Sequence, residues 1–386
     1  MAERVLITGA RAVAALDMAR CLRAAGYEPH LADCSTAWVA RMSRAAGPVH
    51  RHASPVEQPA AFARDIRALI ARLDPVRIIP TCEEVFHLAA LAEADGFSDR
   101  LFAPPPDRLS TLHAKDRFAA LCRRLALPVP DTATVADRAA LEAFAGDAAD
   151  HVFKPVWSRF GARTLIAPTL PELAAVAPTP DAPWVVQRRI IGEEVSFYAV
   201  YHEGRVVAFS AYGSDWRLPG GASYVFRPLP ADQTARLRSM ADALAAFAGT
   251  GQIACDAIID TDGQPWLIEC NPRATSGVHL FGRSAAFGQA LMGRGEAEPV
   301  AGIRHAALAL WRYGLPAAIR QGRLAAWRTQ RRDGADVVTA PNDPFPALGL
   351  QADVAMFGLR ALRTGLPLTE AMTVDIEWNG RPFEPD

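Results

Sequence analysis

The residues whose types and spacing best suit chemistry lie on either side of position 260. Two predicted strands, 253–260 and 265–270, are joined by a short turn containing Asp-Gly, which is a strong hairpin signal. In such a hairpin Asp256 faces Glu269, and Asn271 points to the same side because side chains alternate along a strand. Two carboxylates and an amide oxygen are hard oxygen ligands of the kind that Mg²⁺ shares with substrate phosphates. The spacing therefore predicts a magnesium site on this hairpin.

The alternative for these residues is a solvated polar strand face with surface ion pairs. Both Asp256 and Glu269 lie within apolar runs, however, and a buried carboxylate without a partner is costly. Such acids need a cation, which favours the metal site. Arg273 follows Asn271 by two positions and would reach the same cavity, where it is suited to stabilise a phosphoryl group during transfer.

Lysine is almost absent from the chain. Of its 41 basic residues only Lys115 and Lys154 are lysines, and all others are arginines. A chain with this bias is expected to keep lysine where arginine will not serve. Lysine is a compact, rotatable point charge suited to phosphate oxygens, whereas arginine is a rigid planar fork. The two lysines therefore indicate a phosphate site, with chance survival as the alternative.

The composition excludes several classes of protein. The 386 residues, 50% hydrophobic and 22% charged, predict a globular protein of two or three domains. A net charge of −1 argues against a protein that mainly holds nucleic acid. No long apolar stretch predicts a membrane span or a signal peptide, so we expect a cytoplasmic location. The six cysteines form no C-x-x-C pair and are expected to be isolated thiols.

The elements that must position these residues alternate in type along the first hundred positions. Short apolar strands near 5–8, 30–32 and 76–79 are separated by helical patterns, which predicts a parallel sheet. The turn after the first strand lacks the further glycines of a dinucleotide fingerprint, so an NAD site is not expected.

The middle of the chain predicts a different architecture. A proline-rich linker at 103–106 precedes strands near 152–154 and 184–187, with a polar loop at 158–163 between them. A further hairpin and a helix at 231–249 lead to the hairpin of the predicted metal site. From about residue 296 the pattern becomes helical and rich in arginine.

Several of these segments together resemble the ATP-grasp superfamily, which includes D-alanine:D-alanine ligase, biotin carboxylase and the large subunit of carbamoyl phosphate synthetase. The resemblance is carried by the following residues in this order: Lys115, 152–155, 187–194, Cys255-Asp256 and 267–273. It implies an α/β and α+β fold in four parts. These are an N-terminal α/β domain (1–105), a lid or central subdomain (106–190), a catalytic antiparallel subdomain with the Mg site (191–295) and a mainly helical C-terminal extension (296–386).

The resemblance also implies a role for each matching residue. The ATP phosphates would be held by Lys115, Lys154 and the loop that contains Ser158 and Gly161. The adenine would lie against Gln187 and the backbone of Arg188 to Ile190, and the ribose against Glu194. Asp256, Glu269 and Asn271 would hold Mg²⁺, with Arg273 and Lys154 as catalytic residues. The sequence departs from the family in two places: an amide at 187, where an acid is common, and a single glycine in the 158–163 loop.

The implied activity is an ATP-dependent ligation. Mg-ATP would transfer its γ-phosphoryl group to a carboxylate, and an amine would attack the resulting acyl phosphate to form an amide or peptide bond. The expected partners are a small carboxylic acid, with an amino acid as the favoured case, and an amine. Two alternatives stay open: a kinase-like ATP-grasp phosphotransferase that stops at phosphoryl transfer, and a non-catalytic nucleotide-binding module.

Three residues are candidate substrate contacts. Glu83 follows a parallel strand, where it either holds a substrate amine or caps the next helix. Ser223 lies in an irregular segment that is either a loop over the acceptor or an ordinary surface loop. His279 closely follows the metal strand and is either a substrate contact or a structural histidine. The C-terminal extension either packs on the ligase core or builds an oligomer interface, such as that of a homodimer.

Overall fold

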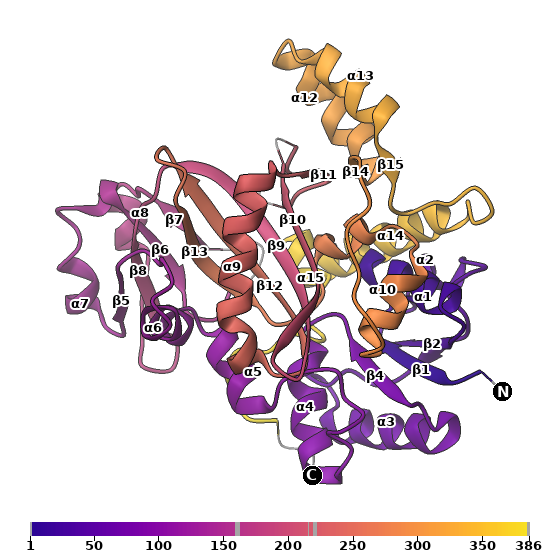
Figure 1. The fold of residues 1–386 in the computed structure, drawn as a ribbon. Helices are drawn as coiled ribbons and strands as arrows, with labels where there is room; N and C mark the ends of the chain where they lie inside the picture. The colour runs from indigo at the N-terminus through magenta and orange to yellow at the C-terminus, as the bar shows by residue number, and fades with distance from the viewer. Residues whose placement is uncertain (1, 159–162, 215, 219–221, 384–386) are drawn as a thin grey trace.

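Three sheets of different kinds build the molecule in the computed structural model, which describes residues 2–158, 163–214, 216–218 and 222–383 (Figure 1). The mixture of a parallel sheet, antiparallel sheets and helices confirms the predicted fold class. None of the helices in these ranges is long and apolar enough to cross a membrane. The cytoplasmic location stays a prediction.

The N-terminal sheet is parallel, with the strand order β3-β2-β1-β4. Its strands are β1 (Arg4–Thr8), β2 (Glu28–Asp33), β3 (Val49–Arg51) and β4 (Arg77–Pro80). The helices α1 (Val13–Ala24), α2 (Trp38–Arg41), α3 (Pro59–Leu73) and α4 (Glu84–Asp95) accompany them. The Thr81 hydroxyl lies beside the turn after β1 and donates to the carbonyl oxygen of Thr8 at 2.7 Å. The end of β4 is thereby tied to the end of β1.

A small antiparallel sheet in the order β5-β8-β6-β7 lies within the segment predicted as the lid, and we call it the lid sheet. It consists of β5 (Thr132–Val135), β6 (His151–Pro155), β7 (Leu165–Ile166) and β8 (Trp184–Arg188), with a short 3₁₀ turn (Ala148–Asp150) and the helices α7 (Arg138–Glu142) and α8 (Leu170–Ala174). This unit has its own apolar core, which includes Leu141, Phe153 and Val186. Lys154 and Gln187 are thus presented by a separately packed sheet.

The largest sheet has seven strands in the order β13-β12-β9-β10-β11-β14-β15. They are β9 (Gly192–His202), β10 (Arg205–Gly213), β11 (Val225–Pro228), β12 (Gly251–Asp260), β13 (Pro265–Asn271), β14 (Arg304–His305) and β15 (Ala335–Asp336). The helices α9 (Ala231–Ala248), α5 (Pro106–His113) and α6 (Lys115–Arg124) pack against it, sharing one apolar cluster with β9, β12 and β13. Although α5 and α6 fall within the predicted 106–190 subdomain, their apolar side chains face this sheet. The predicted domain boundaries stay a prediction.

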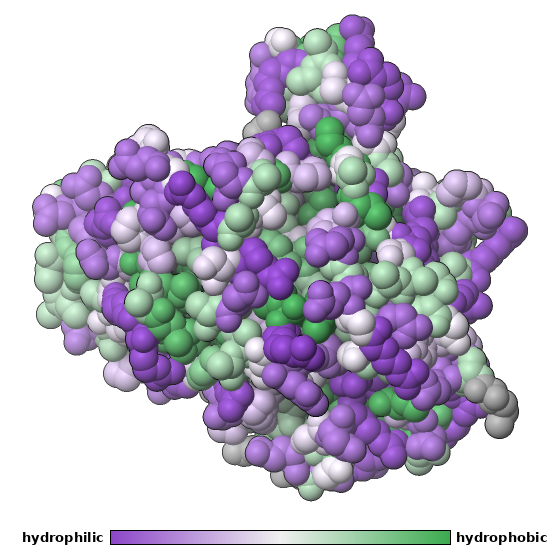
Figure 2. All heavy atoms as spheres, viewed as in Figure 1, coloured by the Kyte–Doolittle hydropathy of each residue, from purple (hydrophilic) through white to green (hydrophobic). Residues whose placement is uncertain are grey.

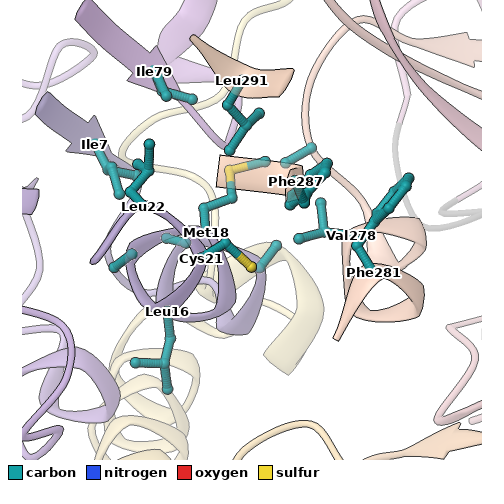
Figure 3. Packing of buried hydrophobic residues seen from close by; sticks show 14 of the residues in the cluster. Ile7, Leu16, Met18, Cys21, Leu22, Ile79, Val278, Phe281, Phe287 and Leu291 are labelled. Carbon is teal, nitrogen blue, oxygen red and sulfur yellow. The ribbon is translucent and has the colours of Figure 1, made fainter. Parts of the chain in front are cut away.

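A second apolar cluster joins the N-terminal domain to this sheet. Figure 3 shows Met18 and Cys21 of α1 beside Phe281 and Phe287, whose rings stack with centroids 4.2 Å apart. Phe281 ends a 3₁₀ segment (Ser276–Phe281), and Phe287 lies on α10 (Ala285–Leu291). This packing fixes the residues after β13 against the first helix of the chain.

The C-terminal extension is mainly helical, apart from the two-residue strands β14 and β15. Its elements are α11 (Ala307–Ala309), a π-helical turn (Leu310–Gly314), α12 (Leu315–Arg320), α13 (Leu324–Asp333), α14 (Pro346–Thr364) and α15 (Leu368–Ala371). The space-filling view in Figure 2 shows α12 and α13 standing clear of the rest of the molecule with a largely hydrophilic surface. The chain then returns to the N-terminal domain, where the ring of Phe383 packs against Phe62 of α3 and His87 of α4.

Candidate active site

The predicted hairpin is formed by β12 and β13, and its register pairs Asp256 with Glu269. Asp256 also lies opposite Ser196 of β9, whose hydroxyl donates to Asp256 Oδ1 at 2.6 Å. Asn271 points to the same side, and its Nδ2 donates to Asp256 Oδ2 at 3.4 Å. In the described ranges no three His, Cys, Asp or Glu side chains gather as a metal site. The oxygen donors on this hairpin are instead two carboxylates and one amide, which fits a hard ion that also takes oxygens from a phosphate.

Both lysines approach this hairpin from other elements. Lys115 begins α6, and its Nζ lies 3.9 Å from Glu269 Oε2 while donating to the carbonyl oxygen of Ser158 at 3.0 Å. Lys154 lies on β6, and its Nζ donates to Gln187 Oε1 at 3.1 Å. Both lysine side chains are buried. The β12–β13 hairpin, the start of α6 and β6 therefore converge on one cluster.

Burial and like charges shift the pKa values in this cluster. Burial and the neighbouring Glu269 raise the pKa of Asp256 to about 7. Burial also opposes ionisation of Glu269, but the charges of Lys115 and Lys154 outweigh it and lower the pKa of Glu269. Burial lowers the pKa of Lys154, against the pull of the nearby acids. A divalent cation beside Asp256 would relieve the repulsion between the two carboxylates, because it favours the charged form of both.

The residues predicted to bind the base are partly engaged within the lid. Gln187 is buried on β8, and its Nε2 donates to Thr132 Oγ1 of β5 at 3.2 Å. The Arg188 backbone N–H donates to the carbonyl oxygen of Asp131, so a contact of Arg188 with a base edge would need another backbone group. Its guanidinium lies over the ring of Trp266, 5.1 Å from the centroid. Ile190 follows β8 at a half-buried position.

The predicted ribose and phosphate-loop residues each have a partner within the protein. Glu194 is exposed on β9 and forms an ion pair with Arg217, at 3.1 Å between Oε2 and Nη1. Ser158 is half-buried, and its hydroxyl donates to the carbonyl oxygen of Pro155 at 3.2 Å. Gly161 lies outside the described residues.

Arg273 links the hairpin cluster to the end of the parallel sheet. Its Nη2 donates to Asn271 Oδ1 at 3.3 Å and lies 3.8 Å from Glu83 Oε1. Glu83 is buried at the start of α4, directly after β4, as its place in the sequence predicts. An acid and an arginine thus face each other beside Asn271, and such a pair could bind the two charged ends of an amino acid.

The other two substrate candidates have different surroundings. His279 Nδ1 lies 2.7 Å from Asp17 Oδ2, and Asp17 also pairs with Arg20, so these contacts favour the structural alternative for His279. Ser223 is half-buried and bridges to Arg217 in the segment between β10 and β11. Ser223 is therefore paired with Arg217, which in turn forms the ion pair with Glu194, the ribose candidate.

Sequence reasoning missed three residues of the cluster. Ser196 could have been found, because it follows Glu194 by two on the same strand face. Thr132 and Arg217 carry no such signal, since each lies in a segment without a periodic pattern and reaches its partner from far along the chain.

We compared the sequence and the structure with those of known proteins, and only the structure comparison found similar proteins. No family model matches the sequence, and no curated protein is similar to it at a significant level. Solved structures do match. The L-amino acid ligase from Bacillus licheniformis is similar with a TM-score of 0.57 and 15% identity, over 78% of this chain and 78% of its own.

Two further structures give the same result. The biotin carboxylase domain of the Hydrogenobacter thermophilus 2-oxoglutarate carboxylase, solved with MgADP and bicarbonate, has a TM-score of 0.61 and 16% identity over 78% of this chain and 73% of that one. The Thermotoga maritima phosphoribosylamine–glycine ligase has a TM-score of 0.58 and 16% identity over 78% of both chains. At such identities the likeness establishes the fold, and it confirms the predicted ATP-grasp architecture.

Proposed function

We propose that the protein is an ATP-dependent ligase that joins a small carboxylic acid to an amine through an acyl phosphate. We propose further that this acid is an amino acid. One observation carries the proposal: two buried lysines and a set of two carboxylates and an amide converge from three separate elements. Cations opposite hard oxygen ligands are what a magnesium triphosphate requires. The shared fold supports this assignment.

The donor set fits a magnesium ion held by Asp256, Glu269 and Asn271. When bound there, the ion would neutralise phosphate charge during phosphoryl transfer. Lys115 already points at Glu269 and would contact the same phosphates. Lys154 would exchange Gln187 Oε1 for a phosphate oxygen, and this exchange frees the amide oxygen to accept from the adenine amino group. Glu194 would turn from Arg217 to the ribose hydroxyls.

The acceptor side uses the arginine and the acid at the end of β4. Arg273 would bind the substrate carboxylate and stabilise the charge of the acyl phosphate. Glu83 would hold a substrate ammonium group, so the Arg273–Glu83 ion pair would open around the two ends of an amino acid. Attack of the amine on the acyl carbon then forms the C–N bond and releases phosphate and a proton. The lid would exclude water, which protects the acyl phosphate from hydrolysis.

The test begins with calorimetry of Mg-ATP binding to the full chain, followed by a phosphate-release screen over pooled amino acids and amines. We expect nucleotide binding, and phosphate release that requires both an acid and an amine, with the amide identified by mass spectrometry. Accumulation of a stable phosphorylated acid without amine would instead show a phosphotransferase. Binding without any turnover would indicate a nucleotide-binding module, and no binding of Mg-ATP would contradict the proposal altogether.

A further inference from the structure

The C-terminal segment 372–383 crosses the carboxyl ends of the parallel strands and is fastened there by buried contacts. Arg11, which follows β1, pairs with Asp375 at 2.6 Å and donates to the carbonyl oxygen of Met372 at 2.7 Å. The Ser54 hydroxyl donates to the backbone oxygen of Asp375 at 2.6 Å. Asp375 is also paired with Arg360 of α14 at 2.9 Å. The segment is therefore held in place before it reaches the candidate site.

Trp378 is the residue of this segment that contacts the site. Its backbone N–H donates to Glu83 Oε2 at 3.2 Å, while the other oxygen of Glu83 faces Arg273 at 3.8 Å. Its ring stacks on Phe86 with the planes 12° apart and the centroids at 4.5 Å. Farther on, the ring of Phe383 packs edge-on against Phe62 of α3, 5.9 Å away.

The same ring reaches the lid. Trp378 meets the edge of Trp157 with centroids 5.0 Å apart, and Trp157 follows the strand that carries Lys154. The residue before it, Val156, offers its carbonyl oxygen to Lys115 Nζ at 3.5 Å. One tryptophan thus touches the acid of the acceptor site through its backbone and the lid strand through its ring.

We propose that segment 372–383 is a wall of the subsite for the acid substrate and that Trp378 is a positioning residue, which holds the Glu83 carboxylate in its orientation toward Arg273. A carboxylate that accepts a fixed N–H on one oxygen presents the other in a defined direction. The proposal rests on the proposed function, because it gives Glu83 its partner. It assigns to the last residues of the chain a role in binding the acid and none in binding Mg-ATP.

The test compares steady-state constants of Trp378→Ala with those of wild type. Loss of the ring removes the stack on Phe86, which we expect to keep the Trp378 backbone N–H within hydrogen-bond distance of Glu83. We expect KM for the amino acid to rise about tenfold or more, corresponding to about 1.4 kcal/mol, with the Kd of Mg-ATP within about threefold of wild type. Trp378→Phe keeps an aromatic ring on Phe86 and should bring KM for the amino acid most of the way back to the wild-type value. Trp311→Ala, at an exposed tryptophan in the π-helical turn before α12, should change neither constant.

Three results would overturn the inference. An unchanged KM for the amino acid in Trp378→Ala is the first. The second is an additive effect when Trp378→Ala is combined with Glu83→Gln, since a residue that acts through Glu83 must lose its effect there. The third is an equal loss of acid and Mg-ATP binding with a lowered Tm, which indicates a structural role alone.

If Trp378→Ala does not fold, Phe86→Leu loosens the same stack and should raise KM for the acid by about threefold, and an unchanged KM there would equally overturn the inference. A wild-type chain that does not bind Mg-ATP contradicts the proposed function instead, so the two failures are distinguishable.

Discussion

The hairpin β12–β13 and the carboxyl end of the parallel sheet both carry buried carboxylates. The pKa of Asp33 at the sheet end and the pKa of Asp256 on the hairpin are shifted in opposite directions. At the sheet end Arg11 lies between two carboxylates, 2.7 Å from Asp33 and 2.6 Å from Asp375. Burial works against ionisation of Asp33, yet Arg11 lowers its pKa to about 2. On the hairpin, burial and Glu269 raise the pKa of Asp256 to about 7.

The difference distinguishes a structural clamp from the candidate binding site. Charges that are paired within the protein stabilise the fold only when every partner is present. Charges whose pKa values are displaced toward the neutral form are incompletely compensated, and they gain most from a ligand of opposite sign. On the hairpin side this description applies to Asp256 and Lys154, whereas the two lysines lower the pKa of Glu269.

The largest expected effect breaks the hairpin side of the comparison. Glu269→Ala removes a proposed metal ligand and the ion-pair partner of Lys115, so we expect turnover to fall by at least about 10³-fold, or about 4 kcal/mol. The fold should persist, because the change also relieves repulsion with Asp256. Phosphate release and thermal unfolding measure the two quantities. Asp262→Ala, an exposed acid in the turn of the same hairpin, is the matched control, and near-normal activity of Glu269→Ala would remove the metal assignment.

The next effect breaks the clamp. Arg11→Met leaves Asp33 and Asp375 buried without their shared cation, which is expected to lower the free energy of unfolding by about 3–5 kcal/mol. Urea unfolding followed by circular dichroism measures it. Arg332→Met, at an exposed arginine whose partner is its neighbour Asp333, should be nearly neutral. An Arg11→Met protein as stable as wild type would show that the clamp does not hold the C-terminal segment.

Lys154→Arg tests why lysine is kept in an arginine-rich chain. A planar fork is longer and bulkier than an ammonium group in a buried position, so we expect kcat/KM to fall by about 30-fold, or about 2 kcal/mol. Arg124→Lys, the reverse change on the exposed side of α6, should have no effect. Wild-type rates for Lys154→Arg would make the survival of the two lysines a matter of chance.

The smallest effect sharpens the comparison through pH. Because Asp256 must lose its proton to bind Mg²⁺ and its pKa is raised to about 7, the affinity for Mg²⁺ should fall by up to about tenfold per unit below that pH. In the clamp the pKa of Asp33 is shifted the other way, so the contribution of the clamp to stability is complete above about pH 4 and is lost only as the pH falls toward 2. Calorimetry of Mg-ATP at pH 6, 7 and 8 measures the first, with Asp256→Asn expected to flatten the dependence. A pH-independent affinity in the wild type would contradict the assignment of Asp256.

Much of the site could be predicted from local sequence. Alternation along two short strands placed Asp256, Glu269 and Asn271 on one face, and the observed register agrees because a tight turn leaves little freedom in pairing. The scarcity of lysine pointed to Lys115 and Lys154, which lie in the same cluster. The position of Glu83 after a parallel strand followed from the general place of ligand contacts in such sheets.

The parts that sequence reasoning missed depend on contacts between distant segments. Trp378 meets Glu83 across 295 positions, and Arg11 meets Asp375 across 364, so no periodicity or spacing signals either pair. The strands β14 and β15 are two residues long and carry no alternation to detect. His279 was ambiguous because its buried partner Asp17 lies on the first helix of the chain.

The contact between Trp378 and Glu83 has a consequence for biosynthesis. Glu83 and the β12–β13 hairpin emerge from the ribosome well before residue 378, and domains generally begin to fold as they are made. A nascent chain can therefore assemble its parallel sheet while the acceptor side still lacks its last wall. In the proposed arrangement, the subsite for the acid is complete only after residue 378 has been translated.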